Sequence, residues 1–405
     1  MSNIEPTKIK TDCPYCANVP TNHGMSYFGS ILSINIDPIF GKITKFAPKF
    51  LKRFVDWLPS ISFPILNMFH LVKFSSDIEK VNTFRSRVVW EEANRRGLQM
   101  EQIIIFGKPI EFYRARLKSG KRIYFESIPI PTEFLDMVDM WDNKSFLKKV
   151  FRKNNIPVPK SVDLTLFQKP EQHMKKLQKI FDSFAKPIIV KPRVGSRGRH
   201  TTTNINSFDD FLKAIEVAQI MTPYIIVEEH LMGDVCRATL VNGKLLGFYR
   251  AGVPTVVGNG VSNIKELIED KNKNKNTRIG EVEINKEILD YIGRSGFTLQ
   301  TVPKADEKVQ LTYRTGRLFG GVTKEMFDEL HPSFIPILEK VGKIVGLGVA
   351  GFDCIVPDPT LDADSQKWGI IEANTLPFID LHYYALEGKP KNIAGAVWDL
   401  WDTKR

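Results

Sequence analysis

The chain has 405 residues, which predicts two or three domains, because single hydrophobic cores stop growing at roughly 250 residues. Its 42% hydrophobic and 25% charged residues are ordinary for a soluble globular protein. The formal net charge of +11 favours anionic partners such as nucleotides, acidic peptides, nucleic acid or an anionic membrane, although a solvated basic surface would also account for it.

The cysteine count and the apolar segments indicate the compartment. Four cysteines are too few for a disulfide scaffold, and the opening MSNIEPTKIK lacks the apolar core of a signal peptide. The most apolar stretch, residues 57–72, falls short of the ~20 residues of a spanning helix and contains Pro59 and Pro64. We therefore expect a cytoplasmic protein with reduced thiols.

Residues 1–75 form a first segment of unknown role. Cys13 and Cys16 have the spacing of a redox or metal-binding pair, and His23 is the only nearby candidate for a further zinc ligand. The loop-like sequence after Cys16 favours an incidental pair or a partial zinc site over redox chemistry. Residues 42–72 are basic and apolar together, and we expect them to pack on the protein body rather than lie on a membrane surface.

The next elements predict a small α/β unit over residues 76–138. It contains a helix ended by Gly97 and strands over MEQIIIFG, IEFYRARL and KRIYFESIPI. A unit over 139–227 follows, and it begins with a helix that carries Lys144 and Lys148 on one face. It continues into the strand and glycine-rich segment IIVKPRVGSRGRH.

Residues 228–405 mix strands and helices, so that the fold class is α+β or α/β. Asn242-Gly243 predicts a hairpin turn, and residues 269–278, EDKNKNKNTR, are typical of a polar surface loop. A helix is expected over HPSFIPILEKVGKIVGLG despite Pro336, followed by strands over VAGFDCIV and WGIIEAN.

The last two strands carry unusual polar residues. Asp353 and Glu372 interrupt apolar runs, where a bare carboxylate is costly unless something compensates its charge. Asn374 shares a strand face with Glu372, so that two carboxylates and an amide oxygen could form a Mg²⁺ site. Pairing of Asp353 and Glu372 with arginines is the alternative.

Basic residues favour the metal interpretation. Lys144, Lys148 and Lys191 accompany the glycine-rich segment, whose Gly195 and Gly198 allow backbone N–H groups to turn toward an anion. The segment lacks the Gly-Lys-Ser/Thr of a Walker loop. Cations together with a metal site indicate a nucleoside-triphosphate site of another kind, since phosphoryl transfer requires mainly positioning and neutralised charge.

In this order, IPVP, VKP, GSRGR, IIVEEHLMGD, GNGVSNIKELIE, VGLGVAGFD and EGKPKNIAGAV resemble the ATP-grasp superfamily of carboxylate–amine ligases. The similarity is greatest to the ATP-grasp domain of cyanophycin synthetase and runs from about Asp142 to Trp401. It implies an ATP-grasp fold, in which two α+β subdomains grip ATP, preceded by a small α/β pre-ATP-grasp-like unit.

The resemblance also implies ligands and roles. ATP and Mg²⁺ would bind, with Mn²⁺ as an alternative metal, and GSRGR would be a mobile lid over the phosphates. The implied nucleotide-binding residues are Lys144, Lys191, Gly195, Ser196, Arg197, Gly198, Glu228, Glu229 and Asp234. The implied metal ligands are Asp353, Glu372 and Asn374, and the implied catalytic residues are Arg237, Arg314 and Arg317.

The sequence departs from the family at several points. RTGRLF replaces a run of neutral residues, so that Arg314 or Arg317 would steady the phosphoryl group or hold an acidic acceptor. Val235 stands where the family carries a carboxylate, which leaves Asp234 as the substitute. The second, Mur-ligase-like module of cyanophycin synthetase is not in this sequence, so that full cyanophycin synthesis is not implied.

We therefore expect an ATP-dependent ligase that forms an amide or peptide bond through an acyl phosphate, on an acidic or peptide-like acceptor. Its partners would be a small-molecule or peptide carboxylate and an amine, with no specific nucleic acid, and the protein would be homo-oligomeric. One alternative is an ATP-grasp phosphotransferase without ligation. The other is a non-enzymatic basic protein that binds nucleic acid or an acidic polymer.

Overall fold

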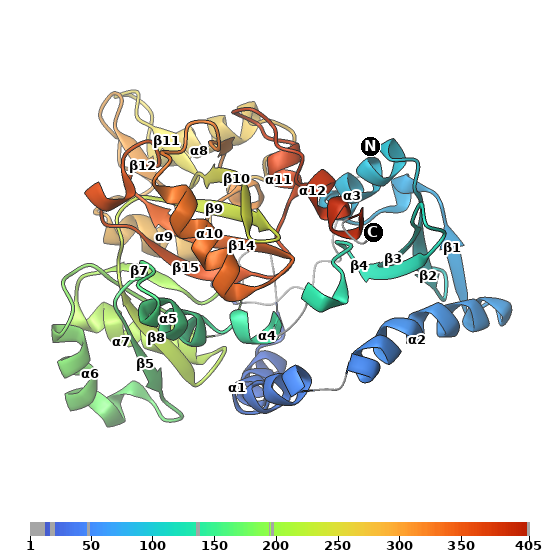
Figure 1. Ribbon diagram of the computed structural model, residues 1–405. Helices are drawn as coiled ribbons and strands as arrows, with labels where there is room; N and C mark the ends of the chain where they lie inside the picture. The colour runs from blue at the N-terminus through green and yellow to red at the C-terminus, as the bar shows by residue number, and fades with distance from the viewer. Residues whose placement is uncertain are drawn as a thin grey trace.

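The computed structural model describes residues 13–16, 21–46, 49–134, 138–193, 195 and 198–402 (Figure 1). Strand pairing within its sheets is antiparallel, which assigns the chain to the α+β class. The three larger sheets form three bodies: a small unit early in the chain and two that face each other around the helix α5 (Lys144–Lys153).

The first unit is a four-stranded sheet in the order β1-β2-β3-β4. Its strands are β1 (Val72–Ser75), β2 (Gln99–Ile105), β3 (Lys108–Arg116) and β4 (Arg122–Glu126). The helix α3 (Phe84–Arg95) covers it, as does α12 (Ile393–Asp402) from the far end of the chain. The indole nitrogen of Trp398 donates to the carbonyl of Val89 at 3.0 Å, so that the last helix completes the core of the first sheet.

The second body is a four-stranded sheet in the order β5-β8-β6-β7. Its strands are β5 (Ser161–Thr165), β8 (Tyr224–Glu229), β6 (Ile188–Pro192) and β7 (Thr202–Ile205), with α6 (Met174–Asp182) and α7 (Phe208–Gln219) packed against them. Ser207 caps α7, because its side chain accepts from the backbone N–H of Asp210.

The third body is a five-stranded sheet in the order β13-β10-β9-β14-β15. Its strands are β13 (Thr323–Glu325), β10 (Lys244–Ala251), β9 (Asp234–Val241), β14 (Val349–Val356) and β15 (Gly369–Asn374). Leu147 and Phe151 of α5 are buried in its core with α10 (Phe334–Val345). The predicted hairpin joins β9 to β10, and Asn242 and Gly243 have φ of 48° and 72°, as a type I′ turn requires.

A two-stranded ribbon, β11 (Thr255–Val257) with β12 (Lys308–Gln310), packs with α8 (Ile264–Asn274) and α9 (Lys286–Arg294). The prediction of a surface loop from residue 269 was wrong as far as Asn274, where α8 ends. Asn263 and Glu266 form a capping box that starts this helix, and Ile264 and Ile268 are buried. Capping and burial therefore outweigh the polar composition of its last turns.

Two helices precede the first sheet, α1 (His23–Phe46) and α2 (Lys49–Met68). Phe63 of α2 stacks on Tyr124 of β4, with ring centroids 5.7 Å apart, whereas Trp57 and Met68 are exposed. The side chains of residues 37–56 lie outside the described part of the chain. Among the described residues, no helix is long and apolar enough to span a membrane. Short helices α4 (Val138–Trp141) and α11 (Asp380–Tyr383) complete the fold.

Candidate active site

A row of polar side chains crosses the five-stranded sheet. Arg237 on β9 pairs in register with Asp353 on β14, which pairs with Glu372 on β15. Residues directly opposite in antiparallel strands point to the same face, so that these side chains meet. A bulge at Ile371 keeps Glu372 in register with Asp353, and Asn374 follows on the same face opposite Gly351.

Arg237 and Asp353 form a buried, bidentate ion pair. The Nη2 atom of Arg237 lies 2.9 Å from Oδ2 of Asp353, and its Nε contacts Oδ1. The sequence-based alternative, in which an acidic residue pairs with arginine, is therefore observed for Asp353. The Nη1 atom of Arg237 is buried without a hydrogen-bond partner among the described residues, so that one donor remains for a ligand.

Lys144, at the start of α5, connects this row to the glycine-rich segment. Its Nζ donates to the carbonyl oxygen of Gly195 at 2.8 Å and lies 3.3 Å from Oε2 of Glu372. Asn143 caps the helix by accepting from the backbone N–H groups of Ser145 and Phe146, which fixes the direction in which α5 starts. The segment and the acidic row are thus held by one ammonium group.

Glu228 holds a second group of lysines on the smaller sheet. Its Oε2 lies 2.8 Å from Nζ of Lys191 on the neighbouring strand β6, and its Oε1 contacts Nζ of Lys148. Lys148 and Glu228 are 1% exposed, so that burial makes their pairing obligatory. Charges of alternating sign therefore extend from one sheet through α5 to the other.

Burial and these neighbours shift the pKa values of the site. Burial lowers the pKa of Lys191 to about 8, and the nearby charge of Lys144 adds to the shift. Burial alone would raise the pKa of Glu372, but Lys144, Asp353 and Lys191 outweigh it and lower the pKa to about 2. Burial raises the pKa of Asp353, against the pull of Arg237. At neutral pH the site therefore holds a largely protonated Lys191 beside an ionised Glu372.

The structure leaves other predicted residues away from this network. Glu229 accepts from the backbone N–H of Lys160 at 2.8 Å, and Asp234 is half exposed, 3.5 Å from Arg250. They flank residues 230–233, where the chain passes from one sheet to the other. The carbonyl of Gly198 accepts from the hydroxyl of Tyr313 at 2.8 Å. Ser196 and Arg197 lie outside the described residues.

The arginines of RTGRLF differ in their surroundings. Arg314 is buried and donates from Nε and Nη2 to the two carboxylate oxygens of Glu287, each at 2.7 Å. Sequence reasoning missed Glu287, because nothing nearby distinguishes it from the other acidic residues. Arg317 donates to Thr323 at 3.0 Å and to the carbonyl of Tyr384 at 2.6 Å, which Arg278 also approaches at 3.3 Å.

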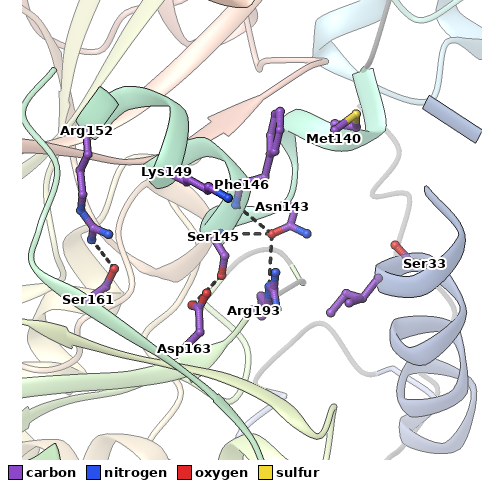
Figure 2. Close-up of a pocket in the computed structure, with 11 residues that line it drawn as sticks. Ser33, Met140, Asn143, Ser145, Phe146, Lys149, Arg152, Ser161, Asp163 and Arg193 are labelled. Carbon is purple, nitrogen blue, oxygen red and sulfur yellow. Dashed lines mark hydrogen bonds between the residues drawn. The ribbon is translucent and has the colours of Figure 1, made fainter. Parts of the chain in front are cut away.

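A pocket of about 570 Å³ lies on the other face of α5 (Figure 2). Lys149, Arg152 and Arg193 line it with Asp163, which accepts from the hydroxyl of Ser145 at 2.7 Å. The residues that line it do not include the lysines, carboxylates or Arg237 of the network described above. The pocket is therefore distinct from the candidate active site.

Comparison with known proteins relates the fold to a superfamily. No family model matches the chain. Cyanophycin synthetase of Synechocystis sp. is 30% identical over 271 residues, which cover 65% of this chain and 30% of the relative. The glutathione biosynthesis bifunctional protein of Clostridium perfringens is 25% identical over 331 residues, 76% of this chain and 40% of the relative.

A solved structure agrees with these relatives. The bifunctional glutathione synthetase of Pasteurella multocida superposes with a TM-score of 0.53 at 23% identity, over 79% of this chain and 44% of that one. These relatives support a relationship to the ATP-grasp superfamily, and the predicted ATP-grasp fold is confirmed. Within that superfamily it is similar to cyanophycin synthetase, although it spans 30% of the length of that relative.

Proposed function

We propose that the chain is an ATP-dependent carboxylate–amine ligase that forms an amide through an acyl phosphate. The observation that carries the proposal is the charge network that joins the two sheets through α5. It offers Lys144 and Lys191 to phosphate oxygens and a carboxylate pair, Asp353 with Glu372, to a metal. The named relatives, a cyanophycin synthetase and a glutathione biosynthesis protein, support a ligase.

The donor set fits Mg²⁺. Asp353 and Glu372 supply carboxylate oxygens, and the amide nitrogen of Asn374 donates to Asp353 at 3.2 Å, which leaves its amide oxygen available. When bound, the metal would neutralise phosphate charge. The unpartnered Nη1 of Arg237 lies beside these groups, and we assign it to an oxygen of the transferring phosphoryl group.

The proposed reaction has two steps, and the residues of the site position the reacting groups in both. The acceptor carboxylate attacks the γ-phosphorus, ADP leaves, and an acyl phosphate forms. The amine then attacks the acyl carbon, phosphate leaves, and the amine loses a proton. Lys144 and Lys191 hold phosphate oxygens through both steps, and Lys191 is largely protonated at neutral pH. The glycine-rich segment would exclude water.

An acidic or peptide-like acceptor is the finer part of the proposal. Arg317 and Arg278 converge on the carbonyl of Tyr384, and burial together with the charge of Arg278 lowers the pKa of Arg317. The hydrogen-bond acceptors that Arg317 has in the described part of the chain, Thr323 and the carbonyl of Tyr384, are neutral, which favours a carboxylate beside its guanidinium. Arg314 is occupied by Glu287, so that the acceptor proposal rests on Arg317.

The test is ADP release with acidic and neutral carboxylates, each with and without an amine, followed by mass spectrometry. A ligase requires both substrates for sustained turnover and yields a product heavier by the amine minus water. Amine-independent ADP release with a stable phosphorylated product would instead establish a phosphotransferase. Lys144→Met should abolish turnover, whereas the exposed Lys149→Met on the same helix should retain it.

A further inference from the structure

Four side chains from distant parts of the chain form a compact cluster outside the candidate active site. The ligand atoms of Cys13, Cys16, His23 and His200 all lie within 4.8 Å of one another. The Sγ atom of Cys16 is 3.1 Å from Nε2 of His23 and 3.4 Å from Nε2 of His200, and Sγ of Cys13 is 3.6 Å from that same Nε2.

The three separations of 3.1, 3.4 and 3.6 Å are close to those of a tetrahedral zinc site. With Zn–S near ~2.3 Å and Zn–N near ~2.0 Å, neighbouring ligand atoms lie roughly 3.3–3.8 Å apart. Two thiolates with two imidazoles are a common structural set for zinc, and sulfur disfavours Mg²⁺ and Ca²⁺. The sequence indicated the two cysteines and His23, and the structure adds His200 as the fourth ligand.

The surroundings of His200 support a ligand role. Its Nδ1 lies 2.8 Å from the carbonyl oxygen of Val217, which can only accept, so that Nδ1 carries the proton. The lone pair of Nε2 is therefore directed at the cysteine sulfurs. Metal-bound histidines are commonly oriented in this way, by a hydrogen bond from their other ring nitrogen. His200 also adopts φ of 54°, which is uncommon for a residue other than glycine.

The cluster is partly enclosed, since Cys13 and His23 are half-buried and the other two residues are fully buried. Cys16 and His200 are 0% exposed, and the backbone N–H of Cys16 donates to the carbonyl of Cys13 at 3.3 Å, which closes the turn between the cysteines. The rings of His23 and His200 stand nearly perpendicular, 86° apart, with both Nε2 atoms near the sulfur of Cys16. A closed set of four ligands is typical of structural zinc rather than catalytic zinc.

We propose that Cys13, Cys16, His23 and His200 bind one structural Zn²⁺ that fixes the end of the glycine-rich segment. His200 directly follows Arg199, the last residue of GSRGR, and its backbone N–H donates to the carbonyl of Tyr15 at 3.4 Å. Binding releases a proton from each thiol and leaves a neutral unit of two thiolates, two imidazoles and Zn²⁺. No electron is transferred.

The metal assignment is tested on the full chain by elemental analysis after purification without added metal. We expect about one zinc per chain in the wild type, and its loss in Cys16→Ser and His200→Gln. Two matched controls, Cys236→Ala in the larger sheet and His70→Gln on the surface, should keep their zinc. Zinc retained in Cys16→Ser and His200→Gln would overturn the proposal.

Wild-type protein alone provides a second test, which does not depend on the folding of a variant. After chelation, added Co²⁺ should give the intense visible bands of tetrahedral sulfur–nitrogen coordination. A wild-type chain that takes up neither Zn²⁺ nor Co²⁺ would overturn the proposal. So would a chain that is lighter by about 2 Da through a Cys13–Cys16 disulfide, which would establish a redox pair instead.

The anchoring role has its own readout. Hydrogen exchange of the amides at 198–205 should accelerate at least tenfold when zinc is chelated, whereas the amides of β14 should not change. Unchanged exchange at 198–205 would contradict the anchoring role. Neither this measurement nor the metal content depends on ATP turnover. The zinc proposal is therefore tested independently of the ligase proposal.

Discussion

Disrupting the ion pair between Arg314 and Glu287 distinguishes a catalytic from a structural role for this arginine. The two side chains are 2% and 6% exposed and share two hydrogen bonds of 2.7 Å. Removing one partner of a buried pair costs about 3–5 kcal/mol, because the other charge stays desolvated. Arg314→Met also deletes the 2.9 Å bond to the carbonyl of Tyr15, while the hydroxyl of Thr312 continues to donate to Glu287.

We therefore expect Arg314→Met to lower the free energy of unfolding by about 4 kcal/mol, measured by urea denaturation. The double variant Arg314→Met/Glu287→Leu should recover most of this loss, because apolar residues of similar size replace a buried pair at little cost. The exposed pair of Lys324 with Glu329, at 2.7 Å, is the control, and Glu329→Gln should cost less than about 1 kcal/mol.

Two results would refute this reasoning. If Arg314→Met unfolds at the wild-type urea concentration but loses turnover, Arg314 acts on the reacting groups. If the double variant loses as much stability as the two single variants summed, the side chains are not coupled across the contact.

Three further predictions concern the active site. Glu372→Gln should reduce turnover on the order of a thousandfold with an intact fold, and near wild-type rates would exclude Glu372 as a metal ligand. ATP affinity should weaken as pH rises through about 8, because Lys191 is charged only below that pKa; a flat titration from pH 7 to 9 would argue against its contact with phosphate. Gly351→Ala places a Cβ 2.8 Å from Cβ of Pro377 and 3.0 Å from Arg237, and it should lower kcat at least about tenfold because Arg237 has to move. Gly293→Ala, with open space around it, should leave kcat unchanged, and equal rates in the two variants would be the contrary outcome.

Local signals made much of the fold and the acidic row predictable. Asn242-Gly243 determines a turn within two residues, and a carboxylate within an apolar strand, such as Asp353, is conspicuous wherever the strand pairs. The ATP-grasp resemblance rested on motifs of this kind in a fixed order. The metal and nucleotide roles of these residues stay predictions.

Contacts between residues that are distant in the sequence could not be predicted, because the signals in a sequence are local. His200 joins Cys16 across 184 positions, and no local periodicity encodes such a contact. The sequence predicts that Arg314 faces the substrate. Its actual partner, Glu287, lies on α9, and no sequence pattern indicates that the two residues pair. The polar composition of the end of α8 predicts a loop. The two buried isoleucines that anchor the helix to the core lie in its first turns, so that its last turns carry no apolar signal.

The C-terminal helix has a consequence for how the protein is made. Trp398 contacts Val89 across 309 residues, so that the first sheet lacks part of its core until the last helix has left the ribosome. At 5–20 residues per second, that interval lasts roughly 15–60 s. During this interval the apolar faces of α3 and β4 stay exposed to solvent. A chaperone that binds nascent chains would therefore bind to the first sheet rather than to the later ones.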